Sequence, residues 1–148
     1  MPSSYNYSKP LQEKLGIKEN SKMAILNPPE GYFDALGKLP RGAVVTHTLN
    51  CPVDFIQYFV AESRKFKTEF PMLKKALTRK GMLWVCWPKA SSNVKTDLNE
   101  GRVREVGLKD GLVDVKVIAV DEVWSGLKFV YRVEERGNIE EACREATR

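Results

Sequence analysis

The fold is decided by the stretch Leu77-Thr78-Arg79-Lys80-Gly81-Met82-Leu83-Trp84-Val85-Cys86-Trp87. Three apolar residues precede it, Phe66, Phe70 and Leu73, and together with Leu77 they have the spacing of one helical face. Gly81 is predicted to end that helix. The continuous apolar run 82–87 is typical of a strand that is buried on both faces of a sheet.

The same alternation continues in both directions along the chain. Strands are predicted at 22–27, 43–48 and 55–60, and a helix at 30–39 that Pro40 stops. A further helix begins near Asp97, which has capping-box spacing to Glu100. Alternating residues in 113–119 and 127–133, with a turn at Ser125-Gly126, predict a closing antiparallel hairpin.

Strands that alternate with helices predict a parallel sheet covered on both faces. We therefore expect one three-layer α/β domain with a mostly parallel sheet and a C-terminal antiparallel hairpin. The C-terminal part of the chain has the turn Leu77 to Gly81, then the strand 82–87, a helix and the closing hairpin. This order resembles the second half of class I methyltransferases. We expect an N-terminal arm at 1–20, the domain at 21–133 and a charged tail at 134–148.

Composition excludes several classes of protein. The 148 residues are 43% hydrophobic and 29% charged, as in an ordinary globular domain. The sequence has neither an apolar run long enough to span a membrane nor a signal-peptide pattern, so we expect a cytoplasmic protein and no membrane partner. Its three widely spaced cysteines indicate reduced thiols.

The net charge of +5 lies in one segment. Residues 61–100 hold nine Lys and Arg against four acidic residues, and the rest of the chain is balanced. The cations of this segment fall mostly off the apolar stripe of the predicted helix, which is typical of a solvated helix face. We therefore do not expect specific nucleic-acid binding.

The turn Asn27-Pro28-Pro29-Glu30 is similar to the Asn-Pro-Pro-aromatic motif of adenine amino-methyltransferases, but Glu30 stands where the aromatic residue belongs. The first strand is followed by a single glycine, Gly31, and the next strand ends in Thr46-His47-Thr48 without an acidic residue. Standard binding of S-adenosylmethionine or a dinucleotide needs closely spaced glycines after the first strand and an acidic residue at the end of the next strand. Both are missing here, so no cofactor is expected.

A metal site is not expected either. His47 is the only histidine, which rules out a two-histidine metal site. Its spacing to Cys51 pairs side chains on a helix and not at the end of a strand, so a Cys–His nucleophile is not expected.

Ligands of open α/β sheets bind beyond the carboxyl ends of the strands. Seven residues in segments that arrive there are the candidate ligand-binding residues: Asn27, Glu30, Tyr32, Trp87, Lys89, Glu122 and Trp124. Both tryptophans are expected to border one pocket, with Lys89 and Glu122 lining it. The alternative is that the two indoles only cap the core.

Four blocks carry a resemblance to a known family: 15–18, 26–32, 83–89 and 114–129. They resemble a family of small bacterial proteins that is known only as a domain of unknown function. The resemblance implies a single-domain cytosolic protein and supplies no catalytic residue.

The leading expectation is a non-catalytic binding module for a small anionic ligand or a protein partner. Its alternative is a divergent S-adenosylmethionine-dependent methyltransferase that binds its cofactor through an unusual loop at 27–32. A second alternative is a weak nucleic-acid-binding protein that uses the 61–100 face.

Overall fold

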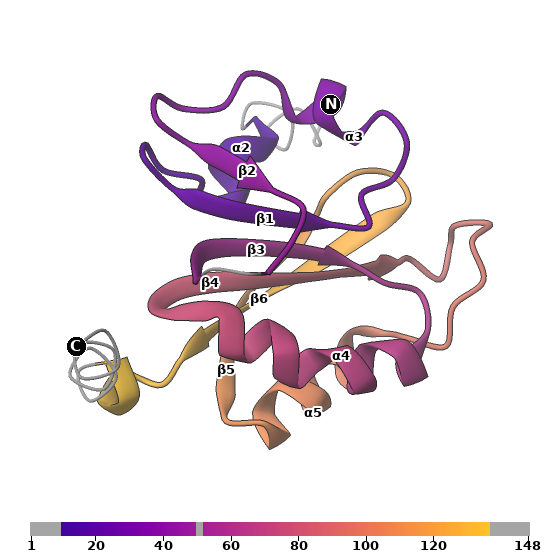
Figure 1. Cartoon of the computed structure of the whole chain (residues 1–148). Coiled ribbons are helices and arrows are strands. Elements are labelled where there is room, and N and C mark those ends of the chain that lie inside the picture. The colour runs from indigo at the N-terminus through magenta and orange to yellow at the C-terminus, as the bar shows by residue number, and fades with distance from the viewer. Residues whose placement is uncertain (1–9, 50–51, 137–148) are drawn as a thin grey trace.

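The computed structural model describes residues 10–49 and 52–136. Their strands form one sheet in the order β2-β1-β3-β4-β6-β5 (Figure 1). The strands are β1 (Lys22–Leu26), β2 (Val44–Thr46), β3 (Val53–Phe59), β4 (Leu77–Pro88), β5 (Leu112–Ala119) and β6 (Trp124–Tyr131). β2, β1, β3 and β4 run parallel, whereas β6 is antiparallel to both β4 and β5. The predicted sheet with its closing hairpin is confirmed.

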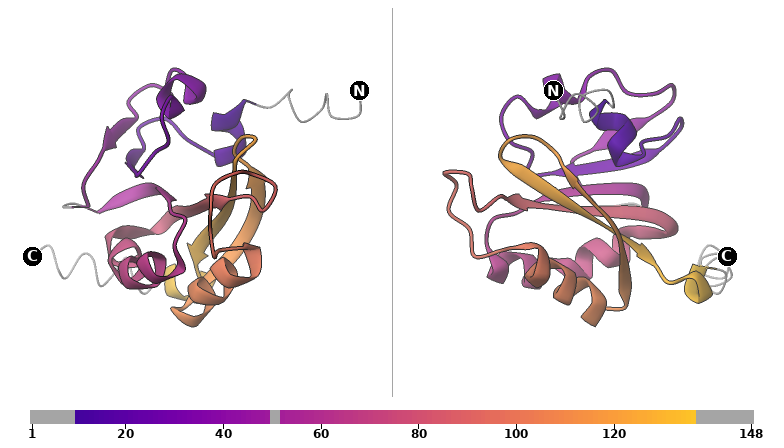
Figure 2. Two further views of the ribbon diagram at one scale, coloured as in Figure 1. Left: turned by 90° about the vertical axis from the view of Figure 1, so that its right-hand side faces the viewer. Right: turned by 180° about the vertical axis from the view of Figure 1, so that it is seen from behind.

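Helices cover both faces of the sheet. The short helices α2 (Leu11–Leu15) and α3 (Tyr32–Leu36) lie on one face, and α4 (Ser63–Ala76) and α5 (Glu100–Lys109) on the other (Figures 1 and 2). The buried stripe of α4 is the predicted one, since Phe66, Phe70 and Leu73 are fully buried. In the described part of the chain, every helix is too short or too polar to cross a membrane.

Side chains of β4 alternate between the two faces. Leu83, Val85 and Trp87 pack against α4 and α5, whereas Trp84 and Cys86 pack on the side of α2 and α3. The indole N–H of Trp84 donates to the carbonyl oxygen of Leu15 at 2.9 Å, and Leu15 is fully buried. The second half of the segment predicted to be an arm is therefore packed on the sheet. Residues 1–9, and residues 137–148 of the predicted tail, lie outside the described residues.

The junction of α4 and β4 differs from the prediction. The helix runs to Ala76 with Pro71 inside it, and Leu77 already pairs with Val53. Gly81 lies within β4, at a shift in register, where an added Cβ would lie 2.7 Å from the carbonyl oxygen of Asp54. Gly81 therefore permits a close approach of two strands and does not end a helix.

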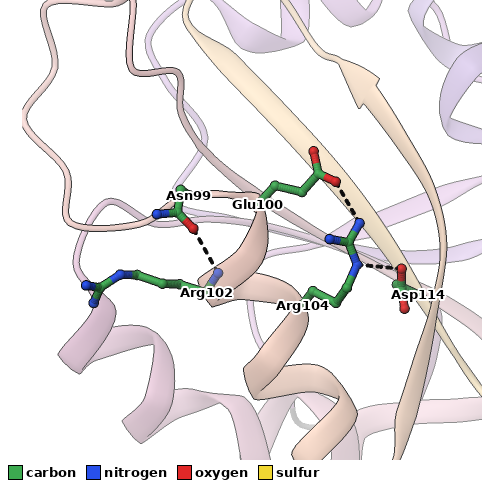
Figure 3. Close-up of polar contacts among 5 residues, drawn as sticks. All are labelled: Asn99, Glu100, Arg102, Arg104 and Asp114. Atoms are coloured by element: carbon green, nitrogen blue, oxygen red, sulfur yellow. Dashed lines mark hydrogen bonds and ion pairs between the residues drawn. The ribbon is translucent and has the colours of Figure 1, made fainter.

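The structure also differs from the prediction in the cap of α5 and in the position of the hairpin turn. Asp97 accepts a hydrogen bond from the backbone N–H of Ser63 at 2.7 Å, and Asn99 caps α5 by accepting from the N–H of Arg102 (Figure 3). In the hairpin, the carboxylate of Asp121 accepts from the backbone N–H groups of Val123 and Trp124. The turn therefore precedes Trp124, and Ser125-Gly126 lies inside β6.

The packing of α5 gives a test of the fold. A Cβ at Gly107 would lie 2.1 Å from the ring of Phe129, whereas a Cβ at Gly101 would meet only the side-chain oxygen of Asn99 at 3.4 Å. Gly107→Ala is expected to lower the free energy of unfolding by about 1–3 kcal/mol through overpacking. The matched Gly101→Ala should change it by less than about 1 kcal/mol. Urea unfolding measures both, and equal effects would contradict this packing.

The two tryptophans near the ends of β4 and β6 give a second test. Trp87 is 5% exposed, and Trp124 is only half-buried. Trp87→Ala is expected to lower the free energy of unfolding by about 3–5 kcal/mol. Trp124→Ala should lower it by about 1–3 kcal/mol because less apolar surface is lost. If chemical denaturation finds Trp124 to be the more costly truncation, the assigned burial is wrong.

Candidate functional site

The carboxyl edge of the sheet gathers the segments that could hold a ligand. They are the turns after β1 and β2, the β3–α4 junction, the loop after β4 and the β5–β6 turn. This edge lies at the right of Figure 1 and faces the viewer in the left panel of Figure 2. Between β1 and β3 the direction of the strand order reverses, and this is where ligands of open sheets bind.

A row of aromatic rings follows this edge on the α3 face of the sheet. Trp124 contacts Phe59 with 5.2 Å between ring centroids, and Phe59 contacts Tyr32 at 4.9 Å. The row continues from Tyr32 to Phe33 at 6.0 Å and from Phe33 to His47 at 6.1 Å. It therefore connects β6, β3, α3 and the end of β2.

The side chain of Asn27 links the ends of β1 and β3. Its amide nitrogen donates to the carbonyl oxygen of Phe59 at 3.3 Å, across the point where the strand order reverses. Asn27 has a φ of 56°, and Gly31 has a φ of 78° at the start of α3. Two left-handed residues therefore bracket the Pro28-Pro29 turn.

Below this edge, three buried polar groups form a chain of hydrogen bonds. The hydroxyl of Tyr32 donates to the side-chain oxygen of Gln57, and the amide nitrogen of Gln57 donates to the sulfur of Cys86 at 3.6 Å. Burial raises the pKa of Tyr32 above its ordinary value and raises the pKa of Cys86 to about 12. Both groups stay protonated at neutral pH, so their role here is to fix α3 on the sheet.

The seven sequence-predicted site residues do not form one group. Asn27, Tyr32 and Trp124 come together around Phe59, on the α3 face. Trp87 lies on the opposite face, in the core beneath α4. The expectation that both indoles border one pocket is therefore wrong. Trp87 pairs with Ser125 across β4 and β6, so these two side chains lie on the same face of the sheet. Trp124 is one residue before Ser125, so its side chain lies on the other face.

The charged residues of the prediction also separate. The ammonium group of Lys89 donates to the backbone oxygen of Asp121 at 2.7 Å, and the Lys89 backbone N–H donates to the carbonyl of Val123. Lys89 thus ties the loop after β4 to the β5–β6 turn. Glu122 and Glu30 are exposed, and within the described residues Lys89 and Glu122 form no ion pair.

A hollow of about 730 Å³ opens on the other side of the same edge. It lies between the start of α4 and the loop 90–99, and its lining carries both signs of charge, from Glu62, Arg64, Lys95 and Asp97. The hydroxyl of Thr96 donates to the carbonyl of Ala61 at 2.6 Å, which with the Asp97–Ser63 bond holds the loop in place. None of the seven predicted residues lines this hollow.

Sequence reasoning missed the members of the aromatic row that lie inside regular elements. Phe59 lies in a predicted strand and Phe33 in a predicted helix, and only the fold places their rings in one row. His47 was considered only as a metal ligand or a base. Within the described residues no group of three His, Cys, Asp or Glu side chains is placed to hold a metal ion, and Cys51 lies outside them.

No family model and no curated protein matches the sequence. Solved structures do match the fold. A methyltransferase from Aquifex aeolicus that is described as SAM-dependent is 14% identical, with a TM-score of 0.57 over 87% of this chain and 97% of its own. The DhpI–SAH complex is 10% identical, with a TM-score of 0.59 over 88% and 86%. The ribosomal protein L11 methylase of Lactobacillus delbrueckii subsp. bulgaricus is 11% identical, with a TM-score of 0.57 over 82% and 75%.

These neighbours correct the functional expectation. The sequence favours a non-catalytic binding module over an enzyme. Two of these neighbours are described as a methylase and a methyltransferase, and the third as a complex with SAH. The comparison therefore overturns the expectation of a non-catalytic module and favours the methyltransferase alternative. At identities of 10–14% the likeness establishes the fold, and this chain has the fold of class I methyltransferases.

Proposed function

We propose that the chain is an S-adenosylmethionine-dependent methyltransferase with a shortened class I fold. The observation that carries the proposal is the reversal of strand order between β1 and β3, at the edge where Asn27 and the aromatic row lie. Open α/β sheets bind their ligands at such a point. The solved neighbours with SAM or SAH in their descriptions support S-adenosylmethionine as that ligand.

The backbone after β1 fits the cofactor, although its sequence is unusual. Glycines in such turns permit left-handed backbone and let a ligand approach the chain closely. In this chain Asn27 and Gly31 adopt the left-handed conformation, and asparagine is one of the few other residues that tolerate it. A Cβ added at Gly31 would meet no atom within 4 Å, so the backbone is open there.

The end of β2 carries polar residues, but not the acidic residue that standard cofactor sites have at this position. Thr46 and Thr48 place two hydroxyl groups 3.3 Å apart, and the exposed His47 lies between them in sequence. A neutral imidazole can accept a hydrogen bond from a ribose hydroxyl. His47, whose ring contacts Phe33, and the 27–31 turn are the groups that would hold the cofactor, because Thr46 and Thr48 line a separate hollow with Lys22 and Val53 at the starts of β1 and β3.

The aromatic row suits the charge of the cofactor. When bound, S-adenosylmethionine supplies a methyl group on a positively charged sulfur. Aromatic faces attract ligand cations through their quadrupole. Phe33 is 42% exposed and Trp124 is half-buried, so both rings can be reached from the carboxyl edge.

Calorimetry and thermal unfolding with S-adenosylmethionine test the proposal. A ligand that binds only the folded chain, present at 100 times its dissociation constant, stabilises the chain by about 2.7 kcal/mol. We expect saturable heat and a rise of several degrees in Tm with millimolar S-adenosylmethionine, and the same with its demethylated product. A chain that shows neither would lack the proposed function.

Two glycine variants localise the binding. Gly31 and Gly16 both have φ of 78°, so alanine at either position introduces similar backbone strain of about 1–2 kcal/mol. At Gly16 the added Cβ would contact only the side chain of Met82 at 3.6 Å. Gly31→Ala should weaken cofactor binding at least tenfold and Gly16→Ala should not. Equal affinities in the two variants would place the cofactor elsewhere.

A further inference from the structure

The segment that runs from α4 into the start of β4 concentrates the positive charge of the protein. Residues 63–80, which comprise α4 and the start of β4, hold seven Lys and Arg residues and one acidic residue, Glu69. Glu69 accepts a hydrogen bond from the hydroxyl of Tyr58. The excess of this segment is larger than the net charge of +5 of the complete chain.

Four exposed cations of α4 have no acidic partner among the described residues. Among the residues that the structure describes, no carboxylate forms an ion pair with Arg64, Lys65, Lys67 or Lys75. The neighbouring helix α5 shows the usual arrangement of a solvated helix. There Arg104 pairs with Glu100 at 2.7 Å and with Asp114 at 2.8 Å (Figure 3). One face of the molecule thus concentrates positive charge.

Both ends of the α4 face are hollowed. At its first turn, Arg64 lines the 730 Å³ hollow of the carboxyl edge together with Lys95. At its last turn, a hollow of about 340 Å³ is lined by Lys74, Lys75 and Arg79, with Asp110 as its one acidic lining residue. The helix between them is about 21 Å long, from 14 residues at 1.5 Å each.

The cations at the last turn are held in place. The guanidinium of Arg79 lies 4.8 Å from the ring centroid of Tyr131, and the hydroxyl of Tyr131 donates to the carbonyl of Lys74 at 2.8 Å. The ammonium group of Lys74 donates to the backbone oxygen of Asp110. Stacking and hydrogen bonds therefore order these long side chains before any ligand binds.

We propose that the outer face of α4 binds the phosphate backbone of a nucleic acid, which makes a nucleic acid the acceptor substrate. The binding surface stands on the charge alone, whereas the acceptor role rests on the proposed methyl transfer. A backbone that follows α4 from the Arg79 end reaches the hollow at the carboxyl edge, which opens on the other side of that edge from the proposed cofactor site. That hollow takes the nucleotide to be methylated.

A nucleic acid suits this face better than an anionic membrane does. Helices that lie on membranes insert large apolar side chains between the lipids. The apolar stripe of α4 is buried in the core, and Met72 is the one large hydrophobic residue of α4 among its exposed side chains. The exposed surface is therefore electrostatic and nearly free of apolar anchors.

Fluorescence anisotropy with a labelled single-stranded RNA, and with DNA of the same sequence, measures the binding. If about four cations each neutralise one phosphate, the logarithm of the affinity falls with the logarithm of salt concentration with a slope of about −3. Lys65→Gln/Lys67→Gln/Lys75→Gln should bind at least tenfold more weakly and flatten that slope. The control Lys38→Gln/Arg41→Gln/Lys116→Gln removes the same charge from other exposed sites and should bind within twofold of the wild type.

The outcomes separate the two proposals. Equal weakening in both triple variants, or binding to phosphatidylserine vesicles without binding to RNA or DNA, overturns the α4 surface. Calorimetry with S-adenosylmethionine on the α4 triple variant is expected to show unchanged cofactor affinity, which also shows that the variant folds. Cofactor binding without nucleic-acid binding in the wild type overturns this inference and leaves the proposed methyltransferase intact. Nucleic-acid binding without cofactor binding in the wild type supports the α4 surface and overturns the proposed methyltransferase.

Discussion

The alternation of side chains along β4 is the constraint on which the other parts of the molecule depend. This strand pairs with parallel β3 on one side and antiparallel β6 on the other, so it joins the two halves of the sheet. Its odd-numbered residues from Leu83 to Trp87 support α4 and α5, and Trp84 holds the α2 segment through its indole N–H. A shift of one residue in its register would exchange the two cores.

The shortness of α3, the helix that follows β1, explains how the carboxyl edge differs from that of a standard cofactor-binding sheet. α3 has five residues, and the turn before it combines two prolines with left-handed Asn27 and Gly31. The bond from Asn27 to the Phe59 carbonyl, and the chain from Tyr32 through Gln57 to Cys86, hold this turn against β3. Specific side-chain contacts thus do here what a longer helix would do through its packed face.

The sequence predicted the order of the elements well because apolar periodicity is a local signal. It also identified the carboxyl edge and three of the residues that meet there. The prediction was wrong where two segments could each form the same turn. Ser125-Gly126 has turn composition, but the carboxylate of Asp121 satisfies two backbone N–H groups and makes the turn earlier. The resulting register places Trp124 on the face opposite Trp87, which periodicity within either strand could not reveal.

Long-range partners were the other source of error. Asp97 had the spacing of a cap for the helix that follows it, and it caps α4 instead, across 34 residues of sequence. Phe59 gave no sign of its contacts with Tyr32 and Trp124, because those residues lie far from it in the chain. Likewise, the cations of α4 could be counted from the sequence, but it could not show that Arg64, Lys65, Lys67 and Lys75 form no ion pair with a carboxylate of the described residues.

The two outer strands of the sheet differ in how they meet solvent. β2 has only three residues, whereas β5 has eight and exposes Val115 and Val117. A long apolar edge invites strand addition by another molecule. In β5 the register shifts between Asp114 and Lys116, and the exposed Lys116 interrupts the valines. A kinked edge with a central ammonium group resists self-association, and this protects the chain from forming fibrils through the strand that its sheet leaves uncovered.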